Sequence, residues 1–274
     1  MKFEKILVAL DFSEQSSKLY HAVNDFKRFG VRQIHLVHVI SPDVLEVNKE
    51  VVKIASDHFN SYLDKYISEG IEVFVKILIG DVADQITSYS DEIDANLIVA
   101  SEHGEGFFKE IFVGSNLFNI IRTLKRPVYV ERFQKTESGF LTSKNRFNKV
   151  LFPTDFSKSS MKAFEFLKDL SSAIREIILL HVLKPTDVNL MIKESSNINE
   201  AIEHLAVELI KVNANVRYLF LEGNPAKQIE STAIKENISM IIMSTRGKGY
   251  LEGLLLGSVA EYLLLHTRIP ILFD

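Results

Sequence analysis

Residues 244–258 read Ser-Thr-Arg-Gly-Lys-Gly-Tyr-Leu-Glu-Gly-Leu-Leu-Leu-Gly-Ser, after the apolar run Met240–Met243 and before a helical pattern. Residues 101–115 read Ser-Glu-His-Gly-Glu-Gly-Phe-Phe-Lys-Glu-Ile-Phe-Val-Gly-Ser, with serines and glycines at matching places. The first serine, first glycine and last glycine of each stretch are displaced from their counterparts by one constant offset. A repeat of this kind in a chain of 274 residues indicates a duplicated domain. Such a loop, between a strand and a helix N-terminus, can present backbone N–H groups to a phosphate.

Shorter motifs repeat in the same order on either side of the chain's midpoint. They are Asp11-Phe12-Ser13 with Asp155-Phe156-Ser157, His38-Val39 with His181-Val182, Gly80 with Gly223, and Pro127 with Pro270. The polar stretch between the halves is typical of a linker. We therefore predict a first domain at residues 1–133, a linker at 134–146 and a second domain at 147–274.

Composition predicts a soluble globular protein and excludes several kinds of site. Hydrophobic residues make up 46% and charged residues 25% of the chain, and the net charge is −4. That charge argues against a general binder of nucleic acid or anionic membranes. The chain has no cysteine, which excludes disulfides, thiol catalysis and thiolate metal sites. No His and carboxylate spacing suggests another metal site, so we predict none.

Neither end of the sequence predicts a targeting or membrane segment. The N-terminus leads into only a short apolar run, unlike a secretory signal. The most apolar region, Leu254–Phe273, is interrupted by charged residues and by Pro270, as expected of a helix followed by a buried strand. By elimination, we expect a cytoplasmic protein.

Each half alternates short apolar runs with longer amphipathic ones, which predicts an α/β fold. The runs expected as strands are Ile6–Leu10, Ile34–Val39, Val73–Ile79, Leu97–Ala100 and Val128–Val130, then Val150–Phe152, Ile177–Val182, Val216–Leu221, Met240–Met243 and Ile269–Phe273. They are nearly continuous in Ile, Val and Leu, as in parallel strands covered on both faces. We predict two tandem Rossmann-like or flavodoxin-like domains. Each has a five-stranded parallel sheet of order 3-2-1-4-5 flanked by helices.

Three motifs together carry a family resemblance: the Asp-Phe-Ser turn, the His-Val pair, and the serine–glycine loop ending in Gly-Ser. On these motifs the sequence resembles the universal stress protein family (UspA-like) in its tandem two-domain form, over essentially the whole chain. The resemblance implies ATP binding in a cleft at the carboxyl ends of the strands, as in many members, while others act by protein association. It also implies that domains pair through their last strands, here as an internal pseudo-dimer. The sequence does not decide whether two chains associate further.

Carried onto this sequence, the resemblance implies nucleotide-binding residues in both halves. In the second half they are Pro153, Thr154, Asp155, Val182, Met243, Ser244, Arg246, Gly247, Gly257, Ser258 and Val259. The weaker candidates in the first half are Asp11, Val39, Ser101, Gly104, Gly114 and Ser115. The N–H groups around Gly247, Gly257 and Ser258 would hold the phosphates, and the Ser258 hydroxyl would add a bond.

The charges of the two loops favour the second half. Glu102 and Glu105 flank the first loop's leading glycine, where the second loop has Thr245 and Lys248. A carboxylate a few ångströms from a triphosphate costs on the order of 1 kcal/mol at the dielectric of an exposed site.

Each candidate also has a purely structural interpretation. Asp155 could contact the nucleotide or cap the next helix, and for Asp11 capping is favoured. The glycine loop could be only a sharp turn. The valines could be only core, and the histidines beside them receive no role. Ser101 and Ser244 stand where the ATP-binding pattern of the family begins with glycine.

The leading hypothesis is a cytosolic stress-response protein. It binds ATP, ADP or AMP mainly in its C-terminal domain, as a regulatory ligand with Mg²⁺ as phosphate counter-ion. The alternative is an interaction or chaperone-like stress protein with degenerate clefts, which the two serines motivate. Slow ATP hydrolysis ranks last because no residue is marked as a water-orienting group, and we assign no catalytic residue.

Overall fold

The structure, a computed structural model, describes most of the chain and divides it into two compact units. The described residues are 3–47, 50–67, 70–101, 114–123, 126–136, 139–142, 145–183, 191–212, 215–247 and 256–274. The first unit spans residues 2–142 and the second residues 143–274. Each unit is an α/β fold with a parallel sheet and flanking helices, as the sequence predicted.

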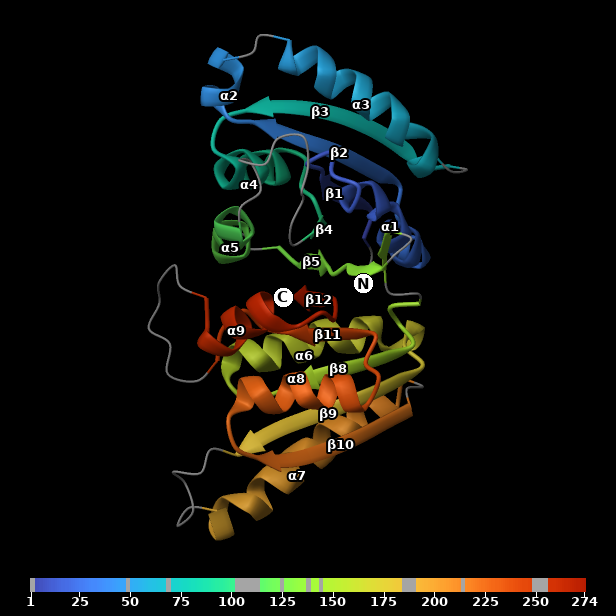
Figure 1. The fold of residues 1–274 in the computed structure, drawn as a ribbon. Helices are drawn as coiled ribbons and strands as arrows, with labels where there is room; N and C mark the ends of the chain where they lie inside the picture. The colour runs from blue at the N-terminus through green and yellow to red at the C-terminus, as the bar shows by residue number, and fades with distance from the viewer. Residues whose placement is uncertain are drawn as a thin grey trace. The chain divides into compact units, whose positions relative to one another are not determined.

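The first unit has five parallel strands in the order β3-β2-β1-β4-β5. The strands are β1 (Lys5–Ala9), β2 (Gln33–Ile40), β3 (Glu72–Ile79), β4 (Leu97–Ser101) and β5 (Val128–Glu131). The helices are α1 (Tyr20–Phe26), α2 (Pro42–Val47), α3 (Val51–Tyr66), α4 (Val82–Glu92) and α5 (Gly114–Thr123), with short 3-10 turns at Ser16–Lys18 and Lys27–Phe29. Right-handed crossovers place α1 and α3 on one face of the sheet and α4 and α5 on the other (Figure 1).

The second unit repeats this plan with strands in the order β10-β9-β8-β11-β12. The strands are β8 (Lys149–Pro153), β9 (Glu176–Leu183), β10 (Asn215–Glu222), β11 (Met240–Met243) and β12 (Ile271–Phe273). The helices are α6 (Lys158–Leu170), α7 (Met191–Ile210), α8 (Pro225–Lys235) and α9 (Ser258–His266), with a 3-10 turn at Ser171–Ala173. Helices α8 and α9 lie together over one face of this sheet (Figure 1).

The strands closely follow the expected runs, with one exception. The run Ile269–Phe273 was expected as a strand, whereas β12 begins only at Ile271. Pro270 has no N–H to donate, and its carbonyl instead accepts a hydrogen bond from the Ile241 N–H at 2.9 Å. The first hydrogen bond between β11 and the segment that leads into β12 is therefore accepted by Pro270, which precedes the strand.

The segment predicted as a linker contains secondary structure. Strands β6 (Gln134–Thr136) and β7 (Gly139–Leu141) form an antiparallel hairpin within residues 134–146. The polar composition that indicated a linker is also typical of a short exposed hairpin. No described helix is long and apolar enough to cross a membrane.

The helix that follows the third strand of each unit begins at a side-chain cap. Asp81 Oδ1 accepts a hydrogen bond from the Asp84 N–H at 3.0 Å at the start of α4. Asn224 Oδ1 accepts from the Lys227 N–H at 3.1 Å at the start of α8, where Pro225 is the first helical residue. The two units therefore start equivalent helices in the same way.

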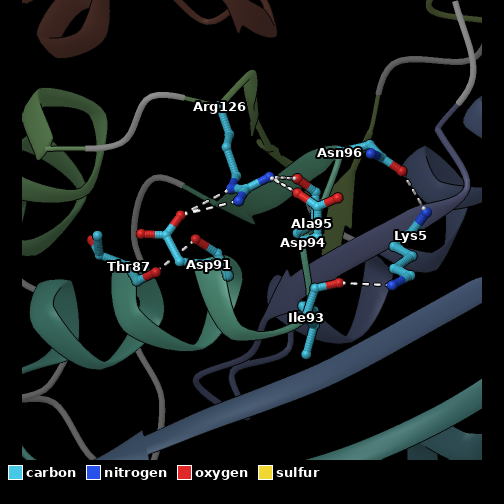
Figure 2. Close-up of polar contacts among 9 residues, drawn as sticks. Lys5, Thr87, Asp91, Ile93, Asp94, Ala95, Asn96 and Arg126 are labelled. Atoms are coloured by element: carbon cyan, nitrogen blue, oxygen red, sulfur yellow. Dashed lines mark hydrogen bonds and ion pairs between the residues drawn. The ribbon is translucent and has the colours of Figure 1, made fainter.

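The amino end of each sheet is tied to the chain before its fourth strand. In the first unit, the Lys5 N–H donates to Asn96 Oδ1 at 2.9 Å, and Lys5 Nζ donates to the Ile93 carbonyl at 2.9 Å (Figure 2). In the second unit, the Lys149 N–H donates to Ser239 Oγ at 2.8 Å. The repeat therefore keeps the position of this bond while changing the acceptor.

Candidate functional site

The turn after β8 places a carboxylate at the carboxyl end of the sheet. Asp155 Oδ1 accepts a hydrogen bond from the Ser157 N–H at 3.0 Å. Ser157 itself caps α6, because its Oγ accepts from the Ser160 N–H at 3.2 Å. Phe156, between them, has φ 56°, a left-handed conformation that is rare for a bulky residue. Asp155 thus shapes the turn and leaves the helix cap to the serine.

His181 supports this turn from the neighbouring strand β9. Its Nδ1 lies 2.8 Å from the Thr154 carbonyl, so the imidazole donates from Nδ1. Its ring lies 5.1 Å from that of Phe156, centroid to centroid. The sequence assigned no role to this histidine, and its recurrence beside the second-strand valine was the signal that could have found one.

The loop after β11 is held by two hydroxyl groups that share one acceptor. Ser244 Oγ donates to the Arg246 carbonyl at 2.6 Å, and Ser159 Oγ, from α6, donates to the same carbonyl at 2.9 Å. The Ser244 side chain therefore bonds the loop's own backbone. These two bonds fix the peptide that precedes Gly247.

Gly247 lies directly against the Asp155 carboxylate. A Cβ at position 247 would stand 2.5 Å from Asp155 Oδ2, closer than a Cβ approaches other heavy atoms. Any larger residue here would therefore force the Asp155 carboxylate or the loop to shift. The loop after the fourth strand and the turn after the first strand thus meet where the strand order reverses, where ligands of such sheets bind.

Gly257 joins the end of the loop to its beginning. Its N–H donates to the Thr245 carbonyl at 2.9 Å, and an added Cβ would lie 3.2 Å from the same oxygen. The Gly257 N–H is therefore engaged within the loop. That the N–H groups around Gly247, Gly257 and Ser258 hold the phosphates stays a prediction.

Helix α9 supplies donors in place of Gly257. Its first intrahelical bond is from the Glu261 N–H to the Gly257 carbonyl at 2.8 Å. The N–H groups of Ser258, Val259 and Ala260 thus have no acceptor within the helix and point out of its positive end. Ser258 is exposed at this end.

The first unit repeats the turn with the same bonds. Asp11 Oδ1 accepts from the Ser13 N–H at 3.0 Å, and Ser13 Oγ accepts from the Ser16 N–H at 3.0 Å. Phe12 has φ 60°. The capping role favoured for Asp11 is therefore wrong, since Ser13 accepts the N–H of the following 3-10 turn.

The two turns differ in how open they are. Asp11 is 6% exposed and Val39 is 1% exposed, whereas Asp155 and Val182 are only half-buried. Phe12 packs between two imidazoles, with centroid distances of 4.2 Å to His38 and 5.1 Å to His58.

His38 belongs to the buried turn of the first unit. Its Nδ1 lies 2.7 Å from the Leu10 carbonyl. Burial lowers the pKa of His38, although this hydrogen bond and the nearby Asp11 partly oppose the shift. The ring is therefore held neutral, with its proton on Nδ1.

The remaining predicted residues are placed as follows. Pro153 ends β8, Thr154 follows it, Val182 lies near the end of β9, and Met243 ends β11. Ser101 ends β4, Gly114 begins α5, and Ser115 lies in α5. Gly104 lies outside the described residues, as does Lys248. Among the described residues no group of three or more His, Asp or Glu side chains could hold a metal ion.

The sequence model of the universal stress protein family matches residues 2–132 and again residues 146–273. The chain belongs to the universal stress protein family. Its two matches confirm the tandem form that the sequence motifs predicted.

Individual family members resemble one half or the whole of this chain. Universal stress protein MJ0577 of Methanocaldococcus jannaschii is 29% identical over 156 residues, which are 46% of this chain and 93% of that protein. The crystal structure of a universal stress protein from Archaeoglobus fulgidus covers 99% of this chain and 96% of its own, with a TM-score of 0.73 and 24% identity. A universal stress protein solved in complex with cAMP covers 47% of this chain and 97% of its own, at 16% identity and a TM-score of 0.38.

Proposed function

We propose that this universal stress protein binds an adenine nucleotide in the cleft of residues 143–274, and that the nucleotide acts as a regulatory ligand. The observation that carries the proposal is the contact between Gly247 and Asp155. Because position 247 is glycine, the loop backbone lies close to the Asp155 carboxylate at the carboxyl edge of the sheet. The half-buried carboxylate of Asp155 would contact the ribose or the base.

The phosphates would lie at the start of α9. The N–H groups of Ser258 and Val259 leave the positive end of this helix, and the Ser258 hydroxyl adds a further donor. Arg246 is only half-buried and brings positive charge to the same loop. Mg²⁺ would be carried mainly by the phosphates, as this ion commonly is.

The first unit is proposed as the weaker site. Its turn has the same hydrogen bonds but is closed by Phe12, His38 and His58, and the loop residues Glu102 and Glu105 add negative charge. A ligand there would have to displace packed rings and approach carboxylates.

Thermal unfolding with ATP, ADP and AMP tests the proposal. A ligand at about 100 times its Kd stabilises a protein by about 2.7 kcal/mol when it binds only the folded state. We expect Gly257→Val to remove this stabilisation, because the larger side chain meets the Thr245 carbonyl, and Gly114→Val to leave it nearly unchanged. No shift with any of the three nucleotides in the unmodified protein would contradict the proposal.

The second candidate function is a stress protein that acts by association, with no nucleotide. One observation favours this second function: the Ser244 hydroxyl and the Gly257 N–H both form hydrogen bonds within the protein. These two groups therefore do not depend on a ligand. If ATP, ADP and AMP leave thermal unfolding unchanged, association without nucleotide becomes the favoured function.

Two further parts of the proposal come from the sequence. We propose a cytoplasmic location, and we expect the two domains to form an internal pseudo-dimer through their last strands. Fractionation of cells would test the location. Disulfide formation by a cysteine pair designed across the two last strands would test the pseudo-dimer.

A further inference from the structure

Helices α8 and α9 each carry one exposed aliphatic side chain near the C-terminal end. Ile234, on α8, is 67% exposed, and Leu265, on α9, is 59% exposed. The helices pack side by side, and Tyr262 Oη donates to Glu230 Oε2 at 3.0 Å between them. Exposed aliphatic side chains on adjoining helices are costly in water and often mark a contact surface.

The corresponding face of the first unit is charged. At the constant offset of the repeat, Asp91 corresponds to Ile234 and Arg126 to Ile269. The Arg126 guanidinium donates to Asp91 Oδ1 from Nε at 3.2 Å and from Nη2 at 3.1 Å (Figure 2). Both members of this ion pair are therefore isoleucine in the second unit. Replacement of both members removes the polar surface without leaving an unpaired charge.

The charged residues on α9 and in the turn after it could pair with those of a second copy of the chain. Glu261 lies one helical turn before Leu265, Arg268 follows shortly after it, and all three are exposed. Two α9 helices packed antiparallel about an axis near Leu265 would bring Glu261 of each chain toward Arg268 of the other. A two-fold interface needs such a self-complementary surface.

We propose that the α8–α9 surface, made of Ile234, Glu261, Tyr262, Leu265 and Arg268, is where two copies of this chain associate about a two-fold axis. A helix as short as α9 is only about 13 Å long, so the buried area is small. Small interfaces belong to weak and reversible complexes. The expected assembly is a weak monomer–dimer equilibrium that shifts with protein concentration.

Sedimentation velocity of the full chain over a range of concentrations tests this surface. Arg122 is the counterpart of Leu265, so Ile234→Asp with Leu265→Arg installs the residues of the first unit. We expect this double variant to raise the dissociation constant at least ~10-fold. Val207→Asp is the matched control, because Val207 on α7 is also 51% exposed, and it should leave the equilibrium unchanged. Circular dichroism melts would show that each variant remains folded.

Charge reversal tests the two-fold geometry. Glu261→Arg alone and Arg268→Glu alone should each weaken association about 5-fold, and the two together should restore it to within about 2-fold. A monomeric wild type at every concentration would overturn the proposal. So would a dimer that the Ile234 and Leu265 changes leave intact, or one that the double reversal fails to restore.

Discussion

The two units of this chain build the same turn and surround it differently. In both, an aspartate holds a serine N–H at 3.0 Å, and a left-handed phenylalanine separates the two residues. In the first unit the turn is packed against the rings of His38 and His58. In the second it lies beside Gly247 and is half-exposed. Both copies keep the backbone geometry of the turn but differ in the neighbouring side chains, and this difference is why we propose the second copy as the ligand site.

The hydrogen bonds within the turn are the same in both units, whereas the exposure of its aspartate differs. Asp11, Ser13 and His38 make the same bonds as Asp155, Ser157 and His181, so those bonds serve the fold in both units. What distinguishes the second unit is access to the carboxylate. The function proposed here therefore depends on what lies around the motif.

The largest expected effect is at Gly247. Gly247→Ala places a Cβ 2.5 Å from Asp155 Oδ2, so the loop or the carboxylate must move. We expect nucleotide affinity to fall at least ~100-fold, or about 2.7 kcal/mol, by isothermal titration. Gly104→Ala, at the counterpart position, is the control and should change affinity less than ~2-fold. Comparable losses in the two variants would end the distinction between the units.

The proposed difference between the two units can also be tested by giving the first unit the corresponding residues of the second. In the register of the repeat, His58 corresponds to Ala201, Glu102 to Thr245 and Glu105 to Lys248. The triple variant of the first unit replaces His58, Glu102 and Glu105 by Ala, Thr and Lys. The variant removes the His58 ring that packs on Phe12, and it changes the net charge of the loop from negative to positive.

We expect the triple variant to gain a second, weaker nucleotide site, about 10-fold poorer than the first, because other packing remains. Titration stoichiometry measures it directly. A stoichiometry that stays at one nucleotide per chain would show that side chains other than these three close the first cleft.

The sequence predicted the fold well because strand signals are local. Continuous Ile, Val and Leu runs predicted the ten strands of the two sheets, and only β12 was shortened, by Pro270. The site was harder to predict from the sequence, because hydrogen bonds between residues far apart in the chain cannot be inferred from motif spacing. The bond of Ser159 to the Arg246 carbonyl, and that of Gly257 to Thr245, are of this kind.

A smaller effect is expected at the two serines that bond the Arg246 carbonyl. Ser159→Ala or Ser244→Ala each removes one bond to this oxygen and loosens the peptide before Gly247. We expect each to weaken nucleotide binding about 3- to 10-fold, or about 1 kcal/mol, with little further loss in the double variant. Ser231→Ala, at an exposed position of α8, is the control. Additive losses would indicate that the hydroxyls act separately.

The smallest effect is a difference in acid stability between the units. Burial lowers the pKa of His35 and of His38, both on β2, so the folded first unit favours neutral rings. Below pH ~6.5 the unfolded chain binds protons that the folded unit does not, and stability falls as pH drops.

The second unit should respond to acid later. Hydrogen bonds from Arg217 lower the pKa of Glu236, and those from Lys168 lower the pKa of Glu208. Their stabilisation is present above the unfolded carboxyl pKa, about 4.3, and is lost only as pH falls below it. Amide exchange, corrected for intrinsic rates, should rise in β2 before β9 between pH ~7 and ~5.5. Faster opening of β9 in that window would reverse the assignment.

The most direct test of the account is isothermal titration of a nucleotide into Asp155→Ala and Asp11→Ala. Each variant loses a 3.0 Å bond to a serine N–H at the equivalent position of its turn. If the proposed function is correct, Asp155→Ala weakens binding by about 10- to 100-fold and Asp11→Ala leaves it within about 2-fold of wild type. Loss of binding with Asp11→Ala, and retention with Asp155→Ala, would contradict it.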